Sequence, residues 1–207
     1  MKMNRKIVLI FISVFALISL SAAGDTDKFD IIKEYLAKAG LIQLDILIEI
    51  ESDIFEDIDT LTGNISIASD GRYHAKINND IYLYDGRTIW DYSAENNQAT
   101  KKVLDENEEY ENRLVFLKEL DRHFATDTII PDSTYKMFRL ADADEACPDS
   151  MEVTISQNPL RISRIEYFDL NGDLNRIFIK NQVLSDSADA GLFRINLPDT
   201  VEIIFLP

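Results

Sequence analysis

Apolar and polar residues alternate along most of this chain, and this alternation predicts β-strands. Leu44, Ile46, Ile48 and Ile50 recur at every second position, a period that places successive side chains on opposite faces of a sheet. We therefore expect residues 44–51 to form a half-buried strand. Similar patterns predict further strands within residues 65–67, 73–77, 81–84, 88–92, 99–104, 151–155, 161–168, 174–179, 193–197 and 201–205.

Four turn sequences separate many of these strands. Asp-Gly pairs occupy positions 70–71 and 85–86, Asn96-Asn97 follows the next strand, and Asn171-Gly172 lies in the C-terminal half. Asp, Asn and Gly tolerate the positive φ angles that tight hairpin turns require. The pattern favours antiparallel meanders and argues against alternating βαβ units.

Helical spacing interrupts the alternation twice. A first helix is expected from a cap at Thr26 or Asp27 to a stop at Gly40, with one apolar face formed by Phe29, Ile32, Tyr35, Leu36 and Ala39. A second, amphipathic helix is expected over residues 113–124, from the spacing of Leu114, Leu117, Leu120 and Phe124. The fold class is therefore mainly β with helices (α+β). A continuous sheet of this length must curl, and the apolar surface that two helices leave uncovered is a candidate pocket.

The N-terminus has the three regions of a secretory signal peptide. Lys2, Arg5 and Lys6 precede an apolar run, and Ser21-Ala22-Ala23 provides small residues for cleavage. We expect a signal peptide at residues 1–23 and a single domain at residues 24–207, with an uncleaved membrane anchor as the alternative. No cysteine follows the cleavage site, so no lipid anchor is expected, and the mature protein should be soluble in the periplasm.

Charge and composition exclude several classes of partner and chemistry. The net charge is −16, and removing the three cations of the signal peptide lowers it to −19, so we expect no nucleic acid partner. With 46% hydrophobic residues, the chain can still build a core. The single cysteine, Cys147, cannot form an internal disulfide and lies in an acidic segment that would not activate a thiolate. We expect a monomer.

Catalytic and metal-binding patterns are weak in this sequence. His74 and His123 lack metal-ligand spacing, and no nucleophile elbow, phosphate-binding glycine loop or zinc motif is present. Residues 169–173 loosely resemble a calcium loop, but a hairpin turn at Asn171-Gly172 explains them. We therefore predict no enzymatic activity, no cofactor and no metal. The aromatic strands around Tyr82, Tyr84 and Trp90 fit either a plain core or a lined cavity.

An ordered set of motifs resembles the LolA family, the periplasmic carriers of outer-membrane lipoproteins. These motifs are the hairpin at residues 84–92 followed by Asn97-Gln98, the strand starts at residues 63–67 and Tyr73, the hairpin at residues 165–172, and the ending at residues 193–198. The resemblance implies an incomplete, curved antiparallel β-barrel closed by helices over an apolar cavity. It also implies binding of acylated lipoproteins, received from an inner-membrane transporter and passed to an outer-membrane receptor.

The resemblance and the strand pattern together give a set of candidate site residues. The cavity is expected to be lined by Ile48, Ile50, Ile65, Ile67, Tyr73, Tyr82, Tyr84, Trp90, Tyr92, Leu117, Phe178 and Phe193. His74 stands where family members usually have an arginine that ties the lid to the barrel, so it is the candidate lid latch. The alternative function is a sensor or adaptor that uses this fold to contact a protein.

Overall fold

The structure is a computed structural model, and it describes residues 27–52, 54, 57–105, 117–118, 120–130, 133–143 and 147–206. The expected signal peptide at residues 1–23 lies outside the described residues, as do residues 113–116 and 119 of the expected second helix. The elements are α2 (Lys28–Lys38), β1 (Leu41–Ser52), β2 (Asp57–Ala68), β3 (Tyr73–Ile77), β4 (Asp80–Tyr84), β5 (Thr88–Ser93), β6 (Gln98–Val103), α3 (Leu120–His123), β7 (Phe124–Ile130), β8 (Thr134–Arg139), β9 (Ser150–Gln157), β10 (Leu160–Phe168), β11 (Leu174–Ser185), η2 (Ala190–Phe193) and β12 (Glu202–Leu206).

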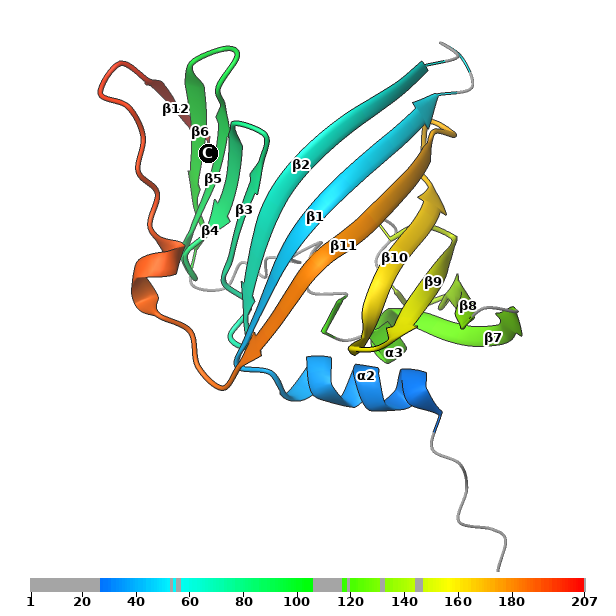
Figure 1. Cartoon of the computed structure of the whole chain (residues 1–207). Coiled ribbons are helices and arrows are strands. Elements are labelled where there is room, and N and C mark those ends of the chain that lie inside the picture. Colours follow the sequence, from blue (N-terminus) through cyan, green and yellow to red (C-terminus); the bar gives the residue numbers. More distant parts are fainter. Residues whose placement is uncertain are drawn as a thin grey trace, which may run out of the picture.

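One curved sheet of 12 strands makes up most of the described chain (Figure 1). Its strand order is β12-β6-β5-β4-β3-β2-β1-β11-β10-β9-β8-β7, and every pairing is antiparallel except that of β12 with β6. The sheet is open, because β12 and β7 end the order on opposite sides. The mainly β, antiparallel and curved fold is confirmed.

The predicted hairpin turns are also confirmed. β2 and β3, β4 and β5, and β10 and β11 pair as neighbouring antiparallel strands. Gly71, Gly86 and Gly172 have φ angles of 87°, 100° and 88°, and Asn97 has a φ of 47°. Short Asp-Gly and Asn-Gly signals are reliable here because few other residues tolerate this backbone region.

α2 covers the lower end of the sheet, where Figure 1 shows it lying crosswise. Asp27 caps the helix by accepting a hydrogen bond from the Phe29 N–H. The helix ends at Lys38, two residues before the predicted stop at Gly40. The Phe29 ring stacks on Tyr135 of β8 with centroids 4.4 Å apart, and the Tyr135 hydroxyl donates to Asp27 at 2.6 Å. This hydroxyl bond and ring stack join the start of the helix to the sheet.

Within the described residues, the predicted helix over residues 113–124 is confirmed only over Leu120–His123. Only Leu120–His123 is α-helical, and Phe124 begins β7, where it pairs with Arg139 of β8. Leu120 and Phe124 are both buried, so their spacing reflects burial on a short helix followed by a strand. Phe124 is wrong as a helix residue, because pairing with the next strand, β8, overrides the local helical pattern.

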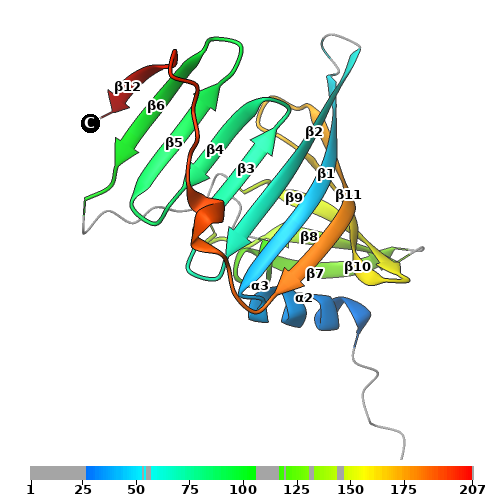
Figure 2. The same ribbon diagram turned by 60° about the vertical axis from the view of Figure 1, so that its left-hand side comes forward.

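The predicted strand over residues 193–197 is likewise wrong. Residues 186–201 form a C-terminal strap that contains the 3-10 helix η2, whose first turn is capped by Asp189. The Phe193 side chain packs on Leu41 and Ala68 of the sheet. It is therefore buried although residue 193 does not belong to a strand. Figure 2 shows the strap crossing in front of β3 and β4 before the chain reaches β12.

The register gives the sheet two distinct faces. Leu44 pairs with Ile65, which pairs with Ala75, and directly opposite residues project from the same side. We call the side that carries these residues the inner face; it shares one core with Phe29 and Ile32 of α2. The opposite side, crossed by the strap, is the outer face.

Candidate functional site: an apolar cavity on the inner face

A cavity of about 680 Å³ lies on the inner face. Its volume falls within the range typical of small-molecule sites. Its walls come from β1, β2, β9, β10 and β11, together with the segment before α3. The lining residues are Leu44, Ile46, Ile65, Leu117, Cys147, Pro148, Asp149, Ser150, Met151, Ile165, Tyr167, Phe168, Asp169, Leu170, Asn171, Ile177 and Ile179.

The deep wall of the cavity is aliphatic because alternate residues of neighbouring strands are in register. Ile46 of β1 lies opposite Ile179 of β11, and Ile165 of β10 lies opposite Ile177. Met151 adds a buried thioether from the start of β9. Chains of CH₂ groups would find only apolar partners along this wall.

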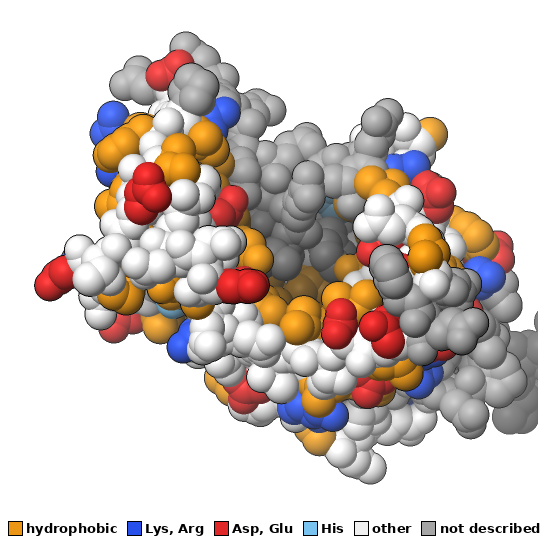
Figure 3. Space-filling model, turned by 90° about the horizontal axis from the view of Figure 1, so that it is seen from above, with side chains coloured by type: hydrophobic (Ala, Val, Ile, Leu, Met, Phe, Trp, Pro, Cys, Tyr) orange, Lys and Arg blue, Asp and Glu red, His pale blue; other side chains and the backbone are white. Residues whose placement is uncertain are grey.

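The mouth of the cavity is formed by the turn between β10 and β11. Phe168 and Leu170 line the cavity but are 61% and 95% exposed, so they lie at its rim. Asp169 shapes the turn, because its Oδ1 accepts hydrogen bonds from the N–H groups of Asn171 at 2.8 Å and Asp173 at 3.1 Å. Figure 3 looks down on the molecule and shows hydrophobic side chains within the hollow between the two wings of the sheet.

Tyr167 brings a polar atom to this otherwise apolar wall. Burial raises the pKa of its hydroxyl, and the negative charge of Asp169 raises it further. The hydroxyl is therefore harder to ionise than an ordinary tyrosine hydroxyl.

Two of the predicted cavity residues line this cavity, Ile65 and Leu117. Six others lie on the same inner face but outside the lining. Of these, Ile67 and Tyr73 are buried in the sheet, whereas Tyr82 is 40% exposed. The six are Ile48, Ile50, Ile67, Tyr73, Tyr82 and Tyr84.

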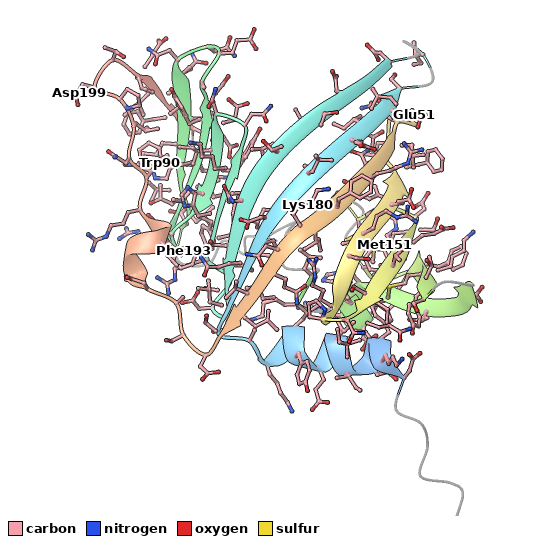
Figure 4. All side chains as sticks on the ribbon, in the orientation of Figure 1. Glu51, Trp90, Met151, Lys180, Phe193 and Asp199 are labelled. Carbon is pink, nitrogen blue, oxygen red and sulfur yellow. The ribbon has the colours of Figure 1, made fainter. Side chains whose placement is uncertain are left out.

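The other four predicted residues, Trp90, Tyr92, Phe178 and Phe193, lie on the outer face. Tyr84 pairs with Ile89, so Trp90 pairs with Leu83 and points away from the cavity. Phe178 lies between the lining residues Ile177 and Ile179, and alternation turns it outward. Shifting a strand by one residue turns each of its side chains to the other face of the sheet. The length of the β4–β5 turn therefore decided that Trp90 and Tyr92 point to the outer face. Figure 4 shows Trp90 and the lining residue Met151 on different wings of the sheet.

His74, the predicted lid latch, also lies on the outer face. It pairs with Leu83 of β4 and hydrogen-bonds to the backbone of Leu192 in the strap. Burial lowers the pKa of its imidazole, and nearby Lys76 adds to the decrease. In this structure the partner of His74 is the C-terminal strap.

Several lining residues were not predicted from the sequence. Leu44 and Ile46 share the parity of the predicted Ile48, and Met151 begins a strand that the alternation had found. The alternation in the sequence already indicated which side chains of a strand share a face. Which strands come together to form the cavity depends on the pairing of β1 with β11. Cys147 and Tyr167 had no sequence signal for this role.

Other kinds of site are not found in the described part of the chain. Within it, no three His, Cys, Asp or Glu side chains are grouped so that they could hold a metal ion. A search of the same residues finds no helix with the length and hydropathy needed to cross a membrane.

Comparison with known proteins gives likeness at the level of the fold. No protein-family model matches the sequence, and no significant match is found among curated proteins. An uncharacterised conserved protein from Thermus thermophilus is 11% identical with a TM-score of 0.50, covering 87% of this chain and 98% of that chain. This likeness shows a shared fold over nearly the whole of that protein.

Two further solved structures are similar at lower scores. A LolA superfamily protein from Nitrosomonas europaea is 9% identical with a TM-score of 0.42, covering 80% of this chain and 97% of that chain. MucB in complex with MucA(peri) is 11% identical with a TM-score of 0.43, covering 87% of this chain and 62% of that chain.

Proposed function

We propose that this chain is a soluble, non-enzymatic periplasmic carrier that binds the acyl chains of lipoproteins in the inner-face cavity and shuttles them from the inner to the outer membrane. The observation that carries the proposal is the aliphatic wall of a 680 Å³ cavity whose rim residues Phe168 and Leu170 are exposed. The N-terminal sequence pattern supports the periplasmic location. The motif resemblance to the LolA family supports lipoproteins as cargo, an inner-membrane transporter as donor and an outer-membrane receptor as acceptor.

Carriage by this cavity needs no chemical step. Each acyl CH₂ group withdrawn from water contributes about 0.8 kcal/mol, so an apolar cavity can hold a lipid without ionic contacts. Transfer then requires an acceptor that offers the acyl chain a better apolar surface.

Two adjacent residues of β11 provide a matched test of cavity binding. Ile177 lines the cavity, whereas Phe178 lies on the outer face, and both are partly buried. Ile177→Glu places a carboxylate in the acyl site and should weaken binding of a fluorescent palmitoyl probe by about tenfold or more, since unpaired charge is poorly accommodated in apolar surroundings. Phe178→Glu, the control, should leave probe affinity unchanged. Equal affinities in both variants at retained folding would overturn the cavity as the acyl site.

Native mass spectrometry of protein purified from the periplasm tests the cargo itself. A carrier should retain a lipid or an acylated peptide that the Ile177→Glu protein lacks. Protein that retains neither, and that fails to bind the palmitoyl probe, would contradict the proposed function.

A second candidate function, contact with a protein, is favoured by strand β12. It is an edge strand of the sheet, and the Glu202 N–H donates to the Asn97 carbonyl on the side of β6. Backbone groups alternate in direction along a strand, so those of Ile203 and Phe205 point away from the sheet. All five residues of β12 are exposed, including Phe205 at 70%. An exposed apolar edge can accept a strand from a partner. Retention of a protein without lipid in the same mass spectra would favour this function.

A further inference from the structure

We infer that the cavity selects acyl chains whose polar end is neutral or cationic and discriminates against anionic head groups, with Asp169 as the selecting residue. This inference rests on the proposed function and narrows its ligand class. The charged residues among those that line the cavity are Asp149 and Asp169, and no lysine or arginine belongs to the described lining.

Both carboxylates lie where a bound lipid would place its polar end. An acyl chain against Ile46, Ile165 and Ile179 would direct its polar end toward the rim that Asp169 shares with the exposed Leu170. A carboxylate or phosphate there would meet like charge, which disfavours binding, whereas an ester, amide or amine would not.

Asp169 contributes more to this selection than Asp149. Asp149 pairs with the Arg139 guanidinium at 2.6 Å, which offsets its charge. Within the described part of the chain, Asp169 accepts hydrogen bonds from the backbone N–H groups of Asn171 and Asp173 and forms no salt bridge. Asp169 itself lines the cavity beside Tyr167, and its charge contributes to the raised pKa of that tyrosine.

The ester and amide linkages of an acylated protein fit such a mouth, whereas free fatty acids and anionic phospholipids do not. The net charge of −16 acts in the same direction over a longer range. We therefore predict a ligand whose acyl chain is joined to its polar end through uncharged linkages.

Three probes with a chain of 16 carbons and head groups of different charge test the inference by displacement of a fluorescent acyl probe at concentrations where each probe is monomeric. Palmitate is anionic, methyl palmitate is neutral and hexadecylammonium is cationic. At low salt, we expect the neutral and cationic probes to bind at least about fivefold more tightly than palmitate, and the cationic advantage to narrow with added salt.

A second hairpin provides the control for Asp169→Asn. Asp85 in the β4–β5 turn accepts N–H bonds from Arg87 and Thr88, so Asp85→Asn removes one charge from a comparable turn outside the cavity lining. Asp169→Asn should bring palmitate close to the neutral probe, whereas Asp85→Asn should leave the ratio unchanged.

The outcomes separate the two proposals. Equal wild-type affinities for all three probes, or equal effects of the two variants, would overturn head-group selection while leaving the carrier function intact. Failure of every probe to displace the acyl label would overturn the carrier function itself. The wild-type comparison decides the question even if Asp169→Asn does not fold.

Discussion

Lys101 lies directly opposite Trp90 on neighbouring strands, with its Nζ 4.8 Å from the centroid of the indole ring. The same ammonium group is 5.6 Å from the ring of Phe205 on β12. These three side chains form a cluster on the outer face, so the only tryptophan of the protein reports on the side of the sheet opposite the cavity.

Trp90 emission should therefore be insensitive to ligand. Titration with a non-fluorescent acyl ligand should leave the emission maximum and intensity unchanged, and Trp90→Ala should leave the affinity for the ligand unchanged. Loss of the indole should lower the free energy of unfolding by about 1–3 kcal/mol, because it removes a partly buried aromatic ring and its cation–π contact. A ligand-dependent shift of emission would mean that binding reaches the outer face.

Gly40 should be essential for the close approach of the C-terminal strap. A Cβ at position 40 would lie 1.9 Å from the Asp186 carbonyl oxygen, and a backbone atom cannot move away cheaply. Gly40→Ala should lower the free energy of unfolding by about 1–3 kcal/mol, the usual cost of overpacking. Denaturant titration measures this loss.

Gly191→Ala is the matched control for Gly40→Ala. A Cβ at this strap residue would meet only the Asp189 side chain at 3.3 Å, which can adjust. A stability loss that equals that of Gly40→Ala would show that the strap, and not its contact at residue 40, is sensitive to substitution.

His74 should make stability fall at mildly acid pH. Burial lowers the pKa of its imidazole below the ordinary value of 6.5, so the unfolded chain binds the proton more readily than the folded protein. The contribution is constant above pH 6.5 and is lost as the pH falls through 6.5 toward the lower pKa of the folded state. Urea midpoints measured from pH 7.5 to pH 5 should decline more for the wild type than for His74→Gln. Parallel declines would contradict a half-buried His74 whose imidazole pKa is lowered.

Local signals in the sequence determined most of the strands and their turns, although they did not indicate β7 and β8 and wrongly indicated a strand at residues 193–197. The alternation at Leu44 to Ile50 and the Asp-Gly pairs before Arg72 and Arg87 predict their elements because side-chain period and positive φ are properties of a few adjacent residues. The first helix was predictable for the same reason, since its cap at Asp27 and its apolar face are local.

Tertiary structure alone decided which faces meet. Trp90 and Phe178 lie in strands that the alternation predicted, yet both side chains point to the outer face. The length of a turn and the register against the neighbouring strand decide which face a strand residue takes. The strand at Phe124 formed where a helix was expected, because β8 supplied a partner. The cavity itself exists because β1 pairs with β11, which brings Ile46 next to Ile179, and no local pattern contains the free energy of a contact between such distant segments.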